Sequence, residues 1–386
     1  MSYDILVCGD FYVGPHAGGR LEPLLESKDY TSLFGELYPD LQQSSLAVVN
    51  LEAPVITSGQ PSSKTGPVIS MKPGVLEALQ SAGVNLVTLA NNHIMDYGVA
   101  GFEETLTRLE QSDLEVVGAG KTNAAKKKPY IKEIKSKKIA IINVCEHEWI
   151  TDQKTEAGAN GVDVIENFYQ IQALKQTVDF VIVIYHGGNE YHPLPTPEMK
   201  KIFRFFIDAG ASTVIGHHTH TYSGYELYKN SPIFYSLGNF IFDSNKKSKG
   251  DNWHTGMAVG FTVVDNELSF KVIPFLQNES NIGLVKLQSE ALKKFESNIQ
   301  RYNDIISNDE RLKEEYVTFA RKMGLQYLSF LNPYEGKLSS LFKKGILPSV
   351  FSKNKLLLLL NLVRCESHKQ LLEIVLQDEI KQKNSL

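Results

Sequence analysis

The first two thirds of the chain repeat one pattern, a short apolar run that ends in polar side chains able to do chemistry. Residues 4–10 form such a run and end in Gly-Asp, residues 45–52 end on Asn50 and Glu52, and residues 85–90 lead into Asn-Asn-His. Apolar, β-branched runs of this length are typical of buried strands. The pattern therefore predicts strands that carry polar groups at their C-terminal ends.

Two later runs end in histidines. Residues 179–186 are the clearest buried strand and end on a histidine, and a β-branched run before Gly216 leads into His217, His218 and His220. Alternate residues of an extended backbone point to the same side, so His218 and His220 can aim their imidazoles at one point. By the same alternation, His217 is expected to point away. This cluster of imidazoles at a strand end indicates a metal site.

Amphipathic stretches between these runs predict helices, at about residues 22–37, 75–82, 99–111 and 199–209. Alternating patterns at residues 257–264 and 268–274 predict two consecutive strands. Strands that alternate with helices early and follow one another late favour an α/β fold, with mixed sheets flanked by helices.

After about residue 284 the pattern becomes helical and charged. It predicts a first domain over residues 1–284 and a helical C-terminal extension over residues 285–386, with helices near residues 289–307, 309–323 and 368–381. Residues 356–363 are apolar on nearly every side, so we expect them to be buried between helices or against the first domain. No catalytic spacing occurs in this extension.

Composition narrows the function classes. The net charge of −4 gives no reason to expect nucleic acid or an anionic membrane as a partner. The cysteines Cys8, Cys145 and Cys365 are widely separated and form no CxxC pair, which argues against a disulfide framework or a thiolate zinc site. The N-terminus lacks the pattern of a signal peptide, and no apolar run is long enough to span a bilayer. We expect a cytoplasmic protein without a transmembrane segment, with a place at the membrane periphery left open.

The strand-end groups form a mixed oxygen and nitrogen ligand set. The candidate metal ligands are Asp10, Glu52, Asn92, His186, His218 and His220. Strand ends are where sites assemble in open α/β sheets, and this ligand chemistry favours Zn, Mn or Fe over Ca. Six ligands exceed the needs of one zinc ion, which favours two divalent metals that clamp a phosphoryl oxygen and activate water.

Further residues near these ligands are candidates for catalysis or support. His93 would act on the substrate as an acid or electrostatic donor. Asp96 would either orient His93 through a hydrogen bond or cap the helix that follows. Asn50, Glu190 and Asn239 are candidates for contacting the substrate or supporting the ligands.

Several motifs in order resemble one family. They are Gly-Asp at 9–10, NLEAPV at 50–55, LANNHIMDYG at 89–98, VVGAG at 116–120, HGGNEY at 186–191, GHHTH at 216–220 and YSLGNFIFD at 235–243. Over roughly residues 4–275 the chain resembles the CapA family of bacterial capsule and poly-γ-glutamate synthesis proteins, whose domain is similar to calcineurin-like metallophosphoesterases. The resemblance implies a layered α-β-β-α sandwich.

The resemblance also implies roles for single residues. Asp10 would be the metal aspartate of the first strand, Glu52 the bridging carboxylate, and Asn92 with His93 the ligand and catalytic pair. The mid-chain ligand histidine would be His186, and the final Gly-His-x-His pair would be His218 and His220. The chain departs from the superfamily pattern at Tyr12, where a histidine is usual, at Glu52, which replaces an aspartate, and at Thr219, where CapA proteins usually carry proline.

Together these observations predict a metal-dependent hydrolase of phosphoester-type bonds with a dinuclear site, working in capsule or exopolymer synthesis. Its substrate would be a phosphoester or an anionic polymer precursor, and its partners the capsule-synthesis machinery. One alternative is a non-catalytic assembly protein with a degenerate metal site, favoured by Tyr12. The other is a metal-dependent γ-glutamyl amidase or transferase.

Overall fold

The computed structural model describes residues 2–14, 19–64, 66–151, 155–244, 252–277, 283–331, 334 and 336–364, with isolated positions up to 383. The chain forms two compact units, residues 1–316 and residues 317–386. The first unit therefore ends later than the expected domain boundary at residue 284, since helix α9 (Ser289–Ile306) packs five apolar side chains into the core of that unit.

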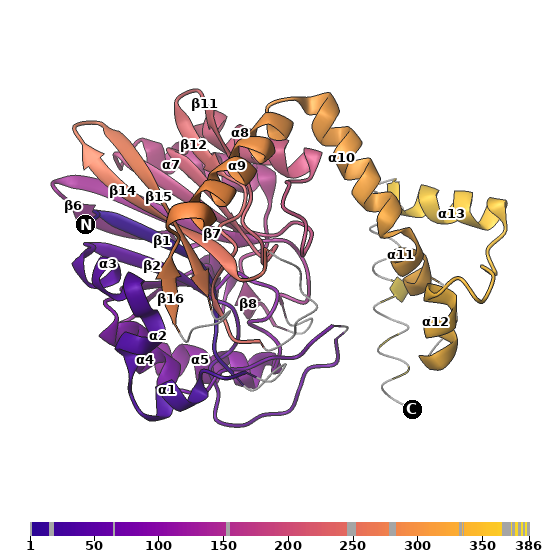
Figure 1. The fold of residues 1–386 in the computed structure, drawn as a ribbon. Coiled ribbons are helices and arrows are strands. Elements are labelled where there is room, and N and C mark those ends of the chain that lie inside the picture. Colours follow the sequence, from indigo (N-terminus) through magenta and orange to yellow (C-terminus); the bar gives the residue numbers. More distant parts are fainter. Residues whose placement is uncertain are drawn as a thin grey trace. The chain divides into compact units, whose positions relative to one another are not determined.

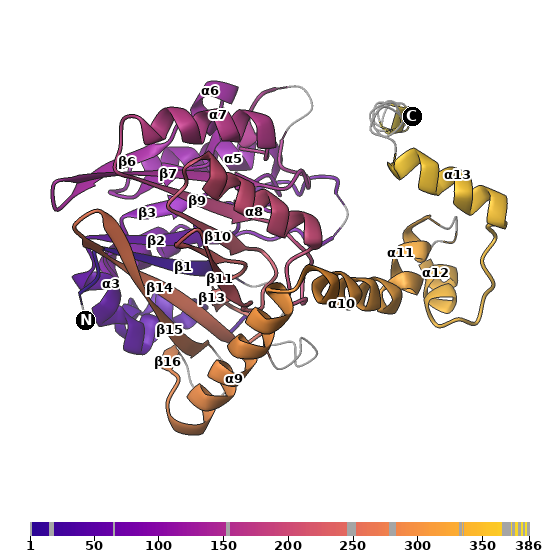
Figure 2. The ribbon, with the colours of Figure 1, turned by 90° about the horizontal axis from the view of Figure 1, so that it is seen from above.

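Two sheets form the centre of the first unit (Figures 1 and 2). The larger sheet has the strand order β16-β15-β14-β1-β2-β3-β4, and β13 also pairs with β1. Its strands are β1 (Ile5–Tyr12), β2 (Leu46–Leu51), β3 (Leu86–Thr88), β4 (Glu115–Val117), β13 (Asn239–Phe242), β14 (Thr255–Val264), β15 (Glu267–Gln277) and β16 (Leu284–Lys286). Strands β1, β2, β3 and β4 run parallel, so their C-terminal ends share one edge.

The second sheet has the order β11-β12-β10-β9-β7-β6. Its strands are β6 (Tyr130–Ile134), β7 (Lys137–Cys145), β9 (Phe180–His186), β10 (Thr213–His217), β11 (Tyr225–Tyr228) and β12 (Ser231–Phe234). The strands β7, β9 and β10 are mutually parallel. A small separate pair joins β5 (Ala119–Gly120) and β8 (Gly158–Ala159).

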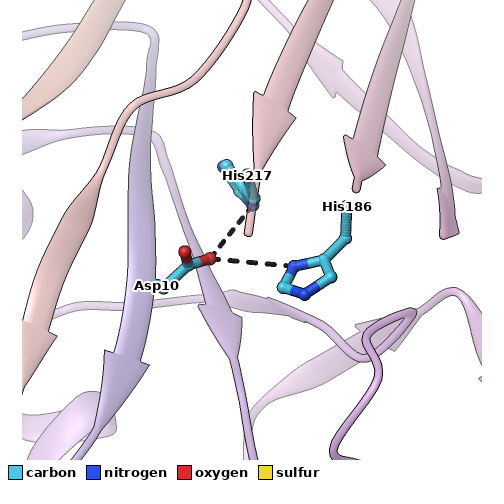
Figure 3. A group of neighbouring side chains, drawn as sticks. All are labelled: Asp10, His186 and His217. Carbon is cyan, nitrogen blue, oxygen red and sulfur yellow. Dashed lines mark ion pairs between the residues drawn. The ribbon is translucent and has the colours of Figure 1, made fainter. Parts of the chain in front are cut away.

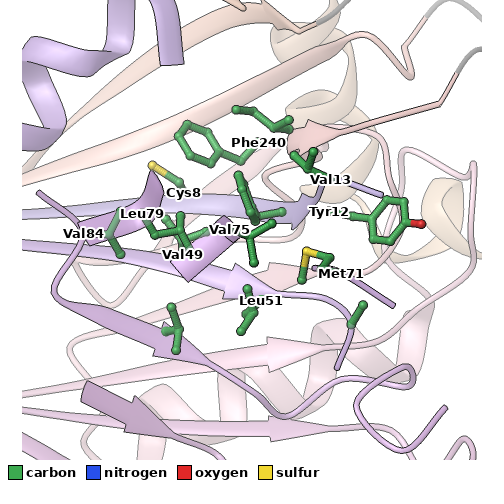
Figure 4. Close-up of a cluster of buried hydrophobic side chains, with 14 of the residues drawn as sticks. Cys8, Tyr12, Val13, Val49, Leu51, Met71, Val75, Leu79, Val84 and Phe240 are labelled. Carbon is green, nitrogen blue, oxygen red and sulfur yellow. The ribbon is translucent and has the colours of Figure 1, made fainter. Parts of the chain in front are cut away.

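Alternation along β1 shows that the larger sheet is covered on both faces. Ile5 and Val7 pack with residues of the second sheet, whereas Leu6 and Cys8 pack with the helices on the other side. Figure 4 shows the cluster of apolar side chains between the larger sheet and these helices, in which Val75 from a helix lies among strand residues. The helices on that side are α1 (Glu22–Glu26), α2 (Tyr30–Phe34), α3 (Tyr38–Gln43), α4 (Gly74–Ser81) and α5 (Gly98–Glu110).

Helices α7 (Val164–Lys175) and α8 (Pro197–Ala209) lie on the opposite side, over the second sheet (Figure 1), and the short α6 spans Asn123–Lys127. The expected α-β-β-α sandwich is thus confirmed. The helical stretch expected at about residues 22–37 is present but is not one continuous helix. It is divided into α1, α2 and the 3₁₀ helix η1 (Gly35–Leu37), because Lys28 and Gly35 adopt positive φ angles of 58° and 49°.

The second unit consists of helices, and the division between the units falls within α10 (Asp309–Lys322). It contains α11 (Gly324–Leu331), α12 (Gly336–Lys343) and α13 (Lys353–Arg364). The expected burial of residues 356–363 between helices is not found within this unit, where Leu357 is 54% exposed and Val363 is 60% exposed. Most of the helix expected at 368–381 lies outside the described residues. No described helix is long and apolar enough to cross a membrane.

Candidate metal centre

The C-terminal ends of parallel strands from both sheets meet at one buried site. Asp10 lies opposite Asn50 on β2 and opposite Asn239 on β13, and His186 lies opposite His217 across β9 and β10. This register places polar side chains of different strands at one level. The sequence pattern of polar strand ends therefore becomes a single cluster in space.

Two carboxylates and three of the predicted histidines form the core of this cluster. The distance from His186 Nε2 to Glu52 Oε1 is 3.6 Å, that from His220 Nδ1 to Asp10 Oδ2 is 3.7 Å, and that from His220 Nε2 to Glu52 Oε1 is 3.8 Å. His218 Nδ1 lies 3.1 Å from His186 Nε2, and all five residues are buried. Oxygen and nitrogen atoms at these separations suit a divalent ion between them.

The predicted amide ligand joins the same cluster. Asn92 Oδ1 lies 3.0 Å from His186 Nε2. The neighbouring Asn91 instead stabilises the turn, donating to the Leu51 carbonyl at 2.9 Å and accepting from the His93 backbone N–H at 3.2 Å. All six predicted metal ligands are thus brought together by the fold.

The expectation that His217 points away from the cluster is wrong. Figure 3 shows its ring turned toward Asp10, and His217 Nδ1 lies 4.0 Å from Asp10 Oδ1. The strand alternation behind that expectation ends at His218, whose φ of 92° turns the backbone out of the extended conformation. Both ring nitrogens of His217 are buried without a hydrogen-bond partner among the described residues. His217 is a ligand candidate that the sequence reading missed.

Burial sets the protonation of the cluster. It raises the pKa of Asp10 to about 7, although hydrogen bonds from Asn50, the His218 backbone and Glu52 act in the other direction. Burial lowers the pKa of His217 to about 3, and burial together with nearby His93 lowers that of His218 to about 4. Neutral imidazoles are the form that binds metal, and a buried carboxylate gains most from a cation.

This pKa shift predicts how Asp10 affects the metal-free protein. Because its folded-state pKa of about 7 lies above the usual 3.8, Asp10 contributes stability at acidic pH that is lost as pH rises toward 7. Asp10→Asn removes this titration. In the presence of chelator, we expect the variant to gain about 3–4 kcal/mol relative to the parent between pH 4.5 and pH 8. Urea unfolding of both proteins at the two pH values measures the shift, and a pH-independent difference would contradict it.

His93 and Asp96 form a hydrogen-bonded pair beside the cluster. His93 Nδ1 lies 2.7 Å from Asp96 Oδ2, and the Ile69 backbone N–H donates to the same oxygen at 2.8 Å. The other Asp96 oxygen pairs with Lys64, whose side chain is 4% exposed and whose Nζ also donates to the Asn92 carbonyl at 3.1 Å. Helix α5 has no side-chain cap. Asp96 therefore orients His93 and does not cap the helix.

The other sequence candidates take different places. Asn50 donates to Asp10 Oδ1 at 2.8 Å, and Asn239 Oδ1 lies 2.8 Å from His220 Nδ1, so both amides hold candidate ligand side chains in orientation. Glu190 is exposed and belongs to none of the buried ligand groups. Tyr12, where the resemblance implies that a histidine is usual, is a core residue whose ring lies 4.9 Å from that of Phe242.

Two glycines allow the close backbone approaches around the site. A Cβ on Gly9 would lie 1.9 Å from the Gly238 carbonyl oxygen, and one on Gly216 would lie 2.1 Å from the Tyr235 carbonyl oxygen. Each glycine directly precedes a cluster residue, Asp10 or His217. Any larger residue at these positions would push apart the strands that carry the cluster residues.

These features define an α/β sandwich protein with a buried carboxylate and histidine cluster between the ends of its two sheets. The chain belongs to the bacterial capsule synthesis protein family PGA_cap, whose model matches residues 4–244. The expected resemblance to CapA is thereby confirmed.

Curated relatives agree with this family. The chain is 32% identical to the PGA biosynthesis protein CapA of Bacillus subtilis over 248 residues, which cover 63% of this chain and 65% of that protein. It is 28% identical to the capsule biosynthesis protein CapA of Bacillus anthracis over 244 residues, covering 61% of this chain and 58% of that protein. The chain thus spans less than two thirds of the length of these two relatives.

Solved structures show more distant likeness. A hypothetical protein from Thermus thermophilus is 15% identical with a TM-score of 0.44, covering 74% of this chain and 99% of that one. A 5′-nucleotidase precursor from the same organism is 13% identical with a TM-score of 0.39, covering 77% of this chain and 53% of that one.

Proposed function

We propose that this protein is a metal-dependent hydrolase of phosphoester-type bonds that acts in capsule or poly-γ-glutamate synthesis. One observation carries the catalytic part. Three buried groups of side chains have members in common, and within each group the candidate ligand atoms lie within 4.8 Å of one another. The groups are Asp10, His186 and His217; Glu52, His186 and His218; and Asp10, Glu52 and His220. The names of the relatives, in capsule and PGA biosynthesis, support the pathway.

The sharing of ligands favours two adjacent metal ions. Asp10, Glu52 and His186 each belong to two of the three groups, so neighbouring ions would have side chains in common. The donor chemistry fits Zn, Mn or Fe, because neutral imidazoles and carboxylates bind these ions well. When bound, such a pair polarises a phosphoryl oxygen and activates water for in-line attack.

The chain's own groups would complete the reaction. His93 is held through Nδ1 by Asp96, which leaves Nε2 as the atom that donates a proton to the leaving oxygen. Asn92 is both the residue before His93 and a candidate ligand, so the acid is fixed relative to the metals. Asn50 and Asn239 keep Asp10 and His220 in their orientations.

A non-catalytic assembly role is the second candidate, and Tyr12 favours it. Its side chain packs in the core and leaves the first strand with Asp10 alone as a ligand. The approach of His217 to Asp10 offers a nitrogen from another strand in this part of the cluster, which favours the hydrolase.

A substrate panel with defined metals separates the candidates. The full chain, loaded in turn with Mn, Fe or Zn, is assayed on a phosphomonoester, a phosphodiester and a γ-glutamyl amide. The hydrolase proposal expects phosphoester turnover that chelator removes and metal restores. Turnover of the amide alone would assign an amidase, and a metal-loaded protein inactive on all three substrates would assign the assembly role.

A further inference from the structure

The helices of the second unit expose many large apolar side chains. On α11, Tyr327 is 53% exposed and Phe330 65%, and in the segment between α12 and α13, Ile346 is 63% exposed. Among the described residues of this unit, Phe342 is the one buried hydrophobic side chain. The unit therefore leaves its large apolar side chains exposed, and apolar side chains gathered in this way mark an interaction site.

The charge of residues 317–364 also differs from that of the rest of the chain. Residues 317–364 contain a single acid, Glu335, against eight basic residues: Arg321, Lys322, Lys337, Lys343, Lys344, Lys353, Lys355 and Arg364. The formal charge of this segment is thus +7, whereas that of the whole chain is −4. The net charge of the whole chain gave no reason to expect an anionic membrane as a partner, but this segment by itself is strongly basic.

Helix α13 combines both properties. Leu356, Leu359, Leu360 and Val363 follow the i, i+3, i+4, i+7 spacing of one helix face, and the exposed Leu357 and Leu358 widen this apolar surface. Exposed lysines occupy its first turn. Its 12 residues span about 18 Å, too short to cross a bilayer core of about 30 Å. A short helix with an apolar face and basic flanks is suited to lie in the plane of a membrane interface.

We propose that residues 317–364 bind the surface of a membrane that contains anionic phospholipid. The exposed leucines and aromatic residues enter the interface, and the lysines pair with lipid headgroups. Charge argues for this partner over a second copy of the chain, because two segments of charge +7 would repel each other. The proposal is independent of the catalytic function.

Vesicle binding by the full chain tests the proposal. Sedimentation with phosphatidylcholine vesicles is compared with sedimentation with vesicles that also contain phosphatidylglycerol, at physiological salt. We expect binding to the anionic vesicles to be stronger by about tenfold or more. Lys353→Gln/Lys355→Gln should weaken that binding about 30-fold, because each basic residue near an anionic surface contributes about 1 kcal/mol of attraction.

Matched control variants test whether binding depends on this segment in particular and not on exposed lysines or apolar side chains elsewhere in the protein. Lys293→Gln/Lys294→Gln on α9 removes two lysines of the first unit and should leave binding unchanged. Leu356→Gln/Leu360→Gln should abolish binding, whereas Ile165→Gln/Tyr169→Gln, which alters exposed apolar side chains on α7, should not.

Three results would overturn the proposal. The first is no binding to anionic vesicles. The second is a loss of vesicle binding in the control variants on α9 and α7 that equals the loss in the α13 variants. The third is a dimer in lipid-free sedimentation velocity that the Leu356→Gln/Leu360→Gln variant dissociates, which would assign the face to a second copy of the chain.

Discussion

His93→Gln is expected to lower the turnover number for phosphoester hydrolysis by about 10²–10⁴-fold while bound metal is retained. His93 lies beside the ligand cluster, and its Nδ1 is engaged by Asp96 at 2.7 Å. Glutamine cannot deliver a proton to a leaving oxygen. The measurement combines steady-state kinetics with metal analysis of the same preparation.

An exposed histidine provides the control for this variant. His147→Gln, outside the cluster, should leave both turnover and metal content unchanged. Full activity in His93→Gln would remove His93 from the mechanism. Loss of metal together with activity would make it a ligand or a structural residue instead of an acid.

Lys64→Met is expected to destabilise the protein by about 3–5 kcal/mol, because it leaves the Asp96 carboxylate buried without its cationic partner. The Lys64 side chain is 4% exposed and that of Asp96 is 1% exposed. Since Lys64 also donates to the Asn92 carbonyl, the variant should loosen the turn that carries His93. Urea unfolding monitored by circular dichroism measures the loss.

A solvent-exposed ion pair is the matched comparison. Lys28 contacts Glu77 at 2.7 Å, with side chains 63% and 53% exposed, so Lys28→Met should leave stability nearly unchanged. Equal effects of the two substitutions would show that burial of the Lys64 pair does not matter. A Lys64→Met protein as stable as the parent would contradict a stabilising ion pair between Lys64 and Asp96.

The strand-end ligands could be predicted from the sequence because the rule behind them is local. A run such as residues 179–186 predicts its own strand, and parallel strands bring their C-terminal ends together whatever their separation along the chain. This is why the sequence alone predicts that Asp10, Glu52 and His186 lie together. Their roles as ligands stay predictions.

Other features depend on tertiary structure and could not be read this way. Lys64 lies in a long loop without periodicity, and only the fold brings it to Asp96. Strand alternation does not predict the position of His217, because the extended backbone stops at the positive φ of His218. The apolar run at 356–363 was expected to be buried, since hydropathy alone does not distinguish a core helix from one that meets an external partner.

Tyr12 and His217 both bear on how many nitrogen ligands lie near Asp10 in the proposed metal centre. Tyr12 stands where the resemblance to metallophosphoesterases implies a ligand histidine, and the structure packs its side chain against Phe242. The same structure brings His217 Nδ1 to 4.0 Å from Asp10 Oδ1. Because His217 would supply the nitrogen that Tyr12 does not, we expect His217→Ala to bind one equivalent fewer of the two metals proposed for the parent. Metal analysis of both proteins tests this, and equal metal content would contradict a ligand role for His217.

Metal content per chain is the most direct test of the proposed centre. The protein is purified without chelator and analysed for Mn, Fe and Zn beside a His218→Ala/His220→Ala double variant. We predict about two equivalents in the parent, as expected for a dinuclear site, and loss of metal in the variant. Absence of metal from both proteins, even after incubation with each ion, would contradict the metal centre and the hydrolase built on it.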